Sequence, residues 1–325
     1  MDFEILVDDH YLKIFSDTAL APVENKSVLS LVNDFEDQKW RYETFENFIW
    51  DNIALTALSA QEREKLTGQS RSTLRESAKS LRLTDKATDI GKGSELAEIV
   101  LYGIMHHYYG ALPVVPKNFY KQNVQDNAKG ADSVHIILEG DDDFSLWFGE
   151  AKFYNSIEDA RLPAVVESVG NSLKTDKLKK ENSIITNTSD IDRLVTNPEL
   201  AARVKDALSS KNSMDQLKAK IHVPILLLHE CTLTASTTEI SDAYREGVRK
   251  YHLERASAYF KKQIDALFGT ISKYSEVKFH IILFPVPDRK KLIERFSKEV
   301  ELYKGFSPFR VEWGGNGRRE GRANG

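Results

Sequence analysis

Two strand-like segments joined by a short polar turn constrain this chain more than any other feature of its sequence. Residues 130–138 and 144–153 are rich in β-branched and aromatic residues, and the five residues between them are polar. This pattern is typical of a β-hairpin. If the turn is centred on Asp141, Asp132 in the first segment faces Glu150 in the second.

The predicted register brings charged side chains together at one end of the hairpin. Directly opposed residues of antiparallel strands have Cβ atoms about 5 Å apart, and side chains alternate between the two faces of a strand. Lys152 therefore projects to the same face as Glu150, and the rest of that face is apolar. Two carboxylates this close repel each other unless a proton or a cation lies between them. We therefore predict that Asp132 and Glu150 bind a divalent metal ion.

The composition of the chain limits the partners and the compartment that we expect. Its 45 basic and 49 acidic side chains give a formal net charge of -4, so any contact with DNA depends on a local basic surface. The single cysteine, Cys231, excludes an internal disulfide and a cysteine-based zinc site. The N-terminal residues lack the pattern of a signal peptide, and no apolar run approaches the roughly 20 residues of a membrane span. We therefore expect a cytoplasmic protein that does not enter a membrane.

A helical segment before the hairpin carries two further carboxylates. Residues 95–107 are apolar on nearly every side of a helical projection, and Ser94 is the predicted N-cap. A helix of this kind is buried, so a glutamate within it, such as Glu98, needs a reason to be there. Glu95 lies nearer the helix start, where a carboxylate also favours the positive end of the helix dipole. The pattern leaves open whether Glu95 or Glu98 reaches the predicted metal site.

Strands and helices alternate after the hairpin, which predicts an α/β fold with a central mixed sheet flanked by helices. We expect residues 1–88 to form a mainly helical cap or docking region, and residues 89–304 to form the core. A polar, lysine-rich stretch at about 174–218 is predicted to be a helical insertion in that core. The low-complexity residues 305–325 are expected to be a flexible tail.

Four of these residues, taken in chain order, resemble the signature of the PD-(D/E)xK nuclease superfamily. That signature is a glutamate on a buried helix, an aspartate on a strand, and Glu-x-Lys on the adjacent strand. The matching residues here are Glu98, Asp132, Glu150 and Lys152. Gly130-Ala131-Asp132 replaces the usual Pro-Asp pair, which is a mild departure because only the aspartate is needed for the chemistry.

The wider layout resembles one branch of that superfamily, the HamA family, which supplies the small subunit of the Hachiman antiphage defence system. The resemblance extends from about Glu46 to Pro287. It is carried by Phe48-Ile49-Trp50, Leu81-Arg82-Leu83, residues 97–102, Pro116-Lys117, residues 130–135 and residues 149–154.

The resemblance implies a restriction-endonuclease-like core and a metal-dependent DNA nuclease that works beside a helicase partner, HamB. Asp132, Glu150 and the Ala151 carbonyl would hold Mg²⁺, for which Mn²⁺ would also serve. Glu98 would hold a metal-bound water or a second metal. Lys152 would orient or help to deprotonate the attacking water and stabilise the charge of the phosphate.

Three lysines on the connection that leads to the hairpin, Lys117, Lys121 and Lys129, are predicted to contact the phosphate backbone of DNA. The glycine-lysine stretch at residues 91–94 lacks the spacing of a phosphate loop, so if the activity needs a motor, another chain supplies it. The acidic residues 141–143 are expected to be a solvated turn tip and not a metal site.

Two other functions are compatible with the sequence. One is a catalytically silent docking module that has a nuclease-like fold, and the other is a stand-alone restriction or repair endonuclease. RNA as the substrate is not excluded by any residue.

Overall fold

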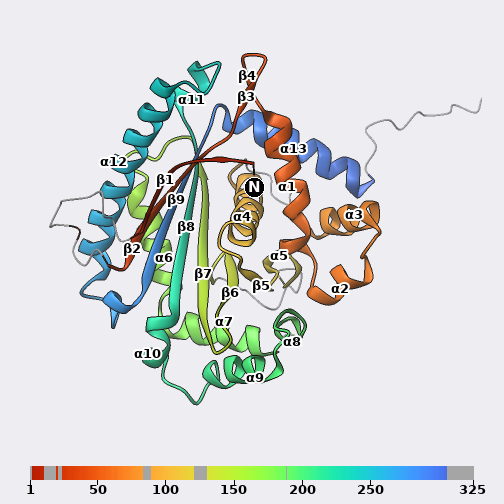
Figure 1. Cartoon of the computed structure of the whole chain (residues 1–325), viewed down its shortest axis with the longest axis vertical. Helices are drawn as coiled ribbons and strands as arrows, with labels where there is room; N and C mark the ends of the chain where they lie inside the picture. The colour runs from red at the N-terminus through yellow and green to blue at the C-terminus, as the bar shows by residue number, and fades with distance from the viewer. Residues whose placement is uncertain are drawn as a thin grey trace, which may run out of the picture.

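The computed structural model describes residues 2–10, 20, 24–82, 89–120, 130–187 and 189–305, and Figure 1 shows the whole chain. A seven-stranded mixed sheet has the strand order β1-β2-β9-β8-β7-β6-β5, which confirms the predicted mixed sheet flanked by helices. The strands of this sheet are β1 (Glu4–His10), β2 (Lys26–Val32), β5 (Leu112–Val115), β6 (Ser133–Glu139), β7 (Asp143–Tyr154), β8 (Ile221–Glu230) and β9 (Lys278–Val286). A separate small hairpin consists of β3 (Phe35–Glu36) and β4 (Lys39–Trp40).

The strands at the centre of the sheet are parallel, and those toward its edges are antiparallel. β2, β9, β8 and β7 pair in parallel, whereas β1 pairs antiparallel with β2, and β6 pairs antiparallel with both β7 and β5. Parallel strands are covered on both faces and therefore read as continuous apolar runs; every residue of β8 except Glu230 is buried. The hairpin of β6 and β7 thus joins the buried parallel centre to an antiparallel edge.

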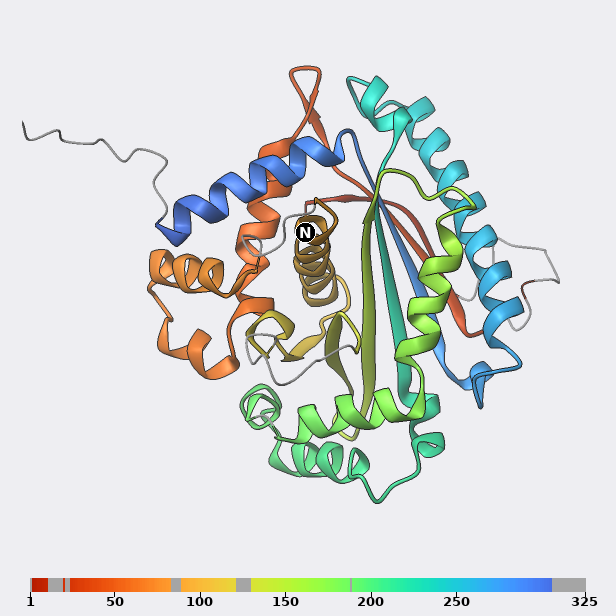
Figure 2. The ribbon, with the colours of Figure 1, turned by 180° about the vertical axis from the view of Figure 1, so that it is seen from behind.

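Helices cover both faces of the sheet, as Figures 1 and 2 show from opposite sides. Because side chains alternate along a strand, Ile225 and Leu227 of β8 pack toward one face, and Leu226 and Leu228 pack toward the other. We call the first the α6 face, because α6 (Leu162–Ser172) and α12 (Asp242–Leu267) cover it. We call the second the α4 face, and it is covered by α1 (Tyr42–Ala57), α4 (Asp89–His107) and α13 (Arg289–Lys304).

The first 88 residues contribute strands to the central sheet as well as helices. β1 and β2 are part of the sheet, and Lys26 of β2 pairs with Phe279 of β9, so the predicted boundary at residue 88 does not separate a helical cap from the core. α1 packs on α4, and α3 (Ser70–Ser80), which follows α2 (Ala60–Lys65), packs on α1 and α13. α4 begins at Asp89, so Ser94 lies inside the helix and is not its N-cap, which corrects the prediction.

The segment predicted to be an insertion is a group of short helices at the lower end of the molecule in Figure 1. Their apolar residues join the same hydrophobic core as the α6 face. These helices are α7 (Thr175–Asn187), α8 (Asp190–Leu194), α9 (Pro198–Ala207) and α10 (Met214–Leu217). Short elements elsewhere are α5 (Lys117–Tyr120), α11 (Thr232–Ser236) and the 3-10 turns η2 (Lys218–Lys220) and η3 (Tyr274–Glu276).

Residues 306–325 of the predicted flexible tail lie outside the described residues. Within the described ranges, no helix combines the length and the apolar character that crossing a bilayer demands.

Candidate active site

The hairpin of β6 and β7 has the register that the sequence predicts. Ser133 pairs with Gly149 and Ile136 pairs with Leu146, so Asp132, which directly precedes β6, comes opposite Glu150. The backbone N–H of Asp132 donates a hydrogen bond to the Gly149 carbonyl at 2.7 Å. The turn is therefore centred where the alternating pattern placed it.

Where β6 has ended, the Asp132 carboxylate accepts a hydrogen bond from β7 that a neighbouring strand would otherwise accept. β7 continues past Gly149 to Tyr154, and there it is paired with β8 alone in the ladder. Asp132 Oδ2 accepts a hydrogen bond from the backbone N–H of Ala151 at 3.1 Å. This bond fixes the carboxylate beside Lys152, whose Nζ lies 3.6 Å from Asp132 Oδ2.

Glu150 and Lys152 complete a compact charged group on the α6 face. The Lys152 ammonium donates a hydrogen bond to Glu150 Oε1, and the Ser168 hydroxyl of α6 donates to the same oxygen at 2.5 Å. Only 4% of the Glu150 side chain is exposed, compared with 20% for Asp132 and 26% for Lys152. The group is therefore buried on the Glu150 side and open to solvent on the side of Asp132 and Lys152.

The electrostatics of this group favour an additional cation. Burial and the negative charge of Asp132 raise the pKa of Glu150 to about 7, although Lys152 and Ser168 act in the opposite direction. Burial opposes the charge of Lys152, but Asp132 and Glu150 outweigh it and raise the pKa of that ammonium. Two carboxylates thus share one ammonium. Oxygen donors with excess negative charge are the ligand type that Mg²⁺ and Mn²⁺ prefer, so the residues present fit such an ion.

Glu98, the metal ligand predicted on the helix, does not lie with these residues. Glu98 is buried on α4, which covers the α4 face, whereas Glu150 points to the α6 face. Among the described residues, no three histidine, cysteine, aspartate or glutamate side chains lie close enough to hold one metal ion. The structure therefore does not bring Glu98 to Asp132 and Glu150. Its rival Glu95 accepts a hydrogen bond from the backbone N–H of Arg82 at 3.0 Å, which is a structural role.

Of the three lysines predicted to contact DNA, the structure describes only Lys117. Lys117 is 1% exposed, and its ammonium donates to both carboxylate oxygens of Glu181 at 2.7 Å. A buried ammonium held in this way does not reach a nucleic acid, so the prediction for Lys117 is wrong. Lys121 and Lys129 lie outside the described residues.

A sequence profile of the HamA family matches residues 9–300, which is nearly the whole chain. The chain belongs to the HamA family. This confirms the resemblance seen in the sequence, and membership of the family implies a role in Hachiman defence. No curated protein matches the chain.

Two residues that shape the site in this HamA chain carry no local signal in the sequence. Ser168 contacts Glu150 from α6, as described above. Glu181 of α7 lies so close to Gly130 that a Cβ atom on this glycine would be 1.8 Å from Glu181 Oε1. A side chain at position 130 would therefore force either Glu181 or the Gly130-Ala131-Asp132 segment to shift, which favours glycine there.

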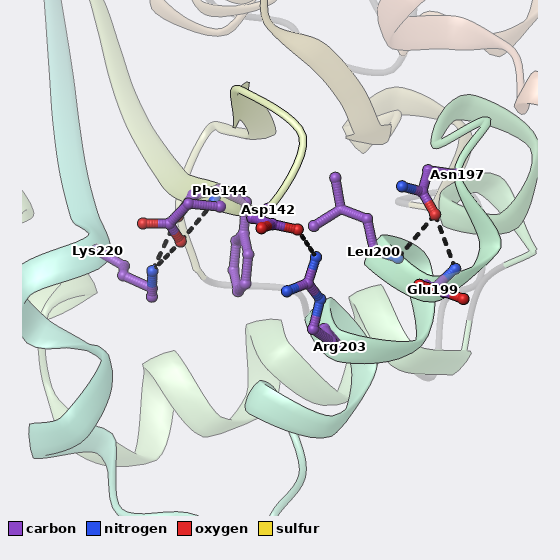
Figure 3. Close-up of polar contacts among 8 residues, drawn as sticks. Asp142, Phe144, Asn197, Glu199, Leu200, Arg203 and Lys220 are labelled. Carbon is purple, nitrogen blue, oxygen red and sulfur yellow. Dashed lines mark hydrogen bonds and ion pairs between the residues drawn. The ribbon is translucent and has the colours of Figure 1, made fainter.

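The acidic turn at the far end of the hairpin is held by one basic residue of the insertion helix α9 and one of η2, as Figure 3 shows. Arg203 of α9 donates to Asp142 Oδ1 at 2.8 Å, and Lys220 pairs with Asp143. The hydrogen bond from Lys220 holds the pKa of Asp143 below its usual value. Asp142 and Asp143 are thus paired with basic side chains in this exposed turn.

The raised pKa of Glu150 predicts how the stability of metal-free protein depends on pH. The folded state binds this proton more tightly than the unfolded state, so its stabilising contribution is present below pH 4.5 and is lost as the pH rises toward 7. The expected loss is about 3 kcal/mol at 1.36 kcal/mol per pKa unit. Urea unfolding in EDTA at pH 4 and pH 7.5 should show this loss in the wild type and not in Glu150→Gln. Equal pH dependence of the two proteins would contradict the prediction.

Proposed function

We propose that this HamA chain is a Mg²⁺-dependent DNA nuclease of the PD-(D/E)xK type that works with the helicase partner of the Hachiman system. The observation that carries the proposal is the convergence of Asp132, Glu150 and Lys152 at the end of the β6–β7 hairpin. A buried glutamate with a raised pKa beside a second carboxylate is more typical of a functional site than of a surface ion pair.

The order of elements around the site supports a restriction-endonuclease-like core. The helix α4, the antiparallel strands β5, β6 and β7, the helix α6 and the parallel strand β8 follow one another in this order. This arrangement places the two candidate carboxylates where an antiparallel hairpin meets a parallel sheet. The insertion α7–α10 lies between α6 and β8 in the chain.

The candidate residues have distinct roles in the proposed phosphodiester hydrolysis. Asp132 and Glu150, with the Ala151 carbonyl, would hold Mg²⁺. When bound, this ion would supply Lewis-acid stabilisation of phosphate charge and a water of lowered pKa. Lys152 stays protonated in the free protein, because the two carboxylates raise its pKa. Its role is therefore to stabilise the charge of the phosphate and to orient the attacking water by hydrogen bonding.

Cleavage of DNA by the purified protein tests the proposal directly. Supercoiled and linear DNA should be cut in Mg²⁺ or Mn²⁺ by the protein together with its helicase partner, and EDTA should abolish the reaction. Asp132→Ala should remove the activity, whereas Asp142→Ala, which changes an exposed aspartate of the same hairpin, should retain it. Cutting by Asp132→Ala at the wild-type rate would reject the site. No cutting by the wild-type complex in any metal would favour the silent docking module.

The hydrogen bond from Ser168 predicts a change in metal affinity. Ser168→Ala should weaken Mg²⁺ binding by about tenfold or more, because residues that orient a metal ligand typically contribute that much. The concentration of Mg²⁺ at half-maximal cleavage measures this effect, and Ser168→Thr should restore it. Ser172→Ala is the matched control, because the hydroxyl of this α6 serine donates to the Val169 carbonyl of its own helix. Equal Mg²⁺ curves for both alanine variants would show that Ser168 does not position Glu150.

A further inference from the structure

An arginine at the start of α6 lies next to the candidate active site. The guanidinium carbon of Arg161 is 5.8 Å from the centre of the Tyr154 ring. Tyr154 follows Lys152 by two residues and Glu150 by four on β7, so the three side chains project to the same face of the strand. The charges of Lys152, Glu150, Arg161 and Asp132 all act on the Tyr154 phenol. The arginine and the catalytic group therefore share one continuous polar surface.

The acidic residues nearest to Arg161 in the sequence are already engaged by other side chains. Glu158 accepts hydrogen bonds from Tyr251 at 3.0 Å and from Arg255 at 3.1 Å. Asp159 pairs with Arg255 at 3.0 Å. In the described part of the chain, Arg161 itself forms no ion pair, and it is exposed. Its charge is thus available to a ligand from outside the protein.

The start of α6 adds positive potential beside Arg161. The first turn of α6 contains no acidic residue, and no side chain caps its N-terminus, so the positive end of this 11-residue helix adds to the charge of the arginine. A guanidinium binds phosphate oxygens through two parallel hydrogen bonds. The Tyr154 ring limits the positions that the guanidinium adopts, which reduces the entropy lost on binding.

We propose that Arg161, held over Tyr154, binds a backbone phosphate of the nucleic acid next to the phosphate that is cut. The inference rests on the proposed nuclease function, because the cut phosphate is taken to lie at Asp132, Glu150 and Lys152. The nucleic acid strand then follows the direction of β7 from Glu150 toward the N-terminus of α6. This subsite fixes the position of the strand and does not take part in the chemistry.

Binding of DNA in the absence of cleavage tests the subsite. Fluorescence anisotropy of a labelled duplex with the full-length chain in EDTA, over a range of salt concentrations, gives affinity and salt dependence. Arg161→Ala should weaken binding by about tenfold and reduce the slope of log K against log salt by about one, the change for one lost phosphate contact. Arg161→Lys should be intermediate, because it keeps the charge and loses the paired hydrogen bonds.

Matched variants separate the subsite from a general loss of charge or of fold. Tyr154→Phe keeps the ring and should bind DNA as the wild type does. Tyr154→Leu removes the ring that holds Arg161 and should bind DNA more weakly. Arg71→Ala removes an exposed arginine of α3, a helix that packs on α1 and α13, away from the α6 face, and should leave binding unchanged. If Arg161→Ala bound the duplex with the same affinity as Arg71→Ala, the inference would be overturned. It would also be overturned if the wild-type chain bound no DNA.

The binding and cleavage results have independent meanings. If Arg161→Ala weakens binding but the wild-type complex cuts no DNA in any metal, the subsite stands and the proposed nuclease function fails. If cutting depends on Asp132 but Arg161→Ala binds DNA normally, the nuclease function stands and the subsite fails. With an active complex, Arg161→Ala should raise KM for DNA by about tenfold and change kcat little, because the contact is made equally in the ground state and the transition state.

Discussion

Replacing Glu150 with alanine is expected to lower DNA cleavage by about a thousandfold or more, the range typical for loss of an essential catalytic group. Glu150 supplies one of the two carboxylates in the candidate site, and Lys152 pairs with Asp132 alone once it is removed. The fold should survive, because burial already disfavours the charge of Glu150 in the metal-free protein. The measurements are the cleavage rate of the complex and urea unfolding in EDTA.

Two further variants show whether the negative charge of Glu150 is what matters. Glu150→Gln keeps the size of the side chain and a carbonyl oxygen that accepts from Ser168, but it carries no charge. It should therefore be as inactive as Glu150→Ala. Glu139→Ala changes an exposed glutamate at the other end of β6 and should cut normally. Activity of Glu150→Gln within tenfold of the wild type would contradict metal binding by this residue.

The hairpin was predictable from sequence because its signal is local. Alternation of apolar residues and one polar turn define both the strands and the register that places Asp132 opposite Glu150. The continuous apolar runs of β8 and β9 likewise predict central strands. The place of β1 and β2 in the central sheet escaped this reasoning, because β2 joins the sheet by pairing with β9 near the other end of the chain. No periodicity within β2 identifies that partner.

The burial of Glu98 was predictable from the sequence, whereas the face of the sheet that its helix covers was not. α4 is buried along nearly its whole described length, as its apolar sequence indicates. A helix that is apolar on every side has no preferred face, so its sequence does not say which side of the sheet it covers. Lys117 illustrates the opposite error: a lysine on a polar connection is usually exposed, and its buried partner Glu181 lies on a helix of the insertion.

Removing one member of the Lys117–Glu181 pair should destabilise the protein more than any surface change. Both side chains are nearly fully buried, at 1% and 4% exposure, so Glu181→Ala leaves a buried ammonium without this counter-ion. The expected loss is about 3–5 kcal/mol of unfolding free energy, measured by urea unfolding. The double variant Lys117→Met with Glu181→Leu should recover most of this loss, because neither charge remains. A double variant as unstable as Glu181→Ala would show that shape, and not charge, decides stability there.

The same pair links the insertion to the candidate active site through Gly130. Gly130→Ala would place a Cβ atom 1.8 Å from Glu181 Oε1, so either the buried pair or the segment that carries Asp132 has to move. We expect this single methyl group to reduce cleavage as well as stability. Gly269→Ala is the matched control, because a Cβ built there meets no atom within 4 Å beyond the adjoining residues. If Gly130→Ala lowers stability but leaves cleavage unchanged, the pair supports the fold without positioning Asp132. If Gly130→Ala lowers both stability and cleavage, α7 helps to position Asp132.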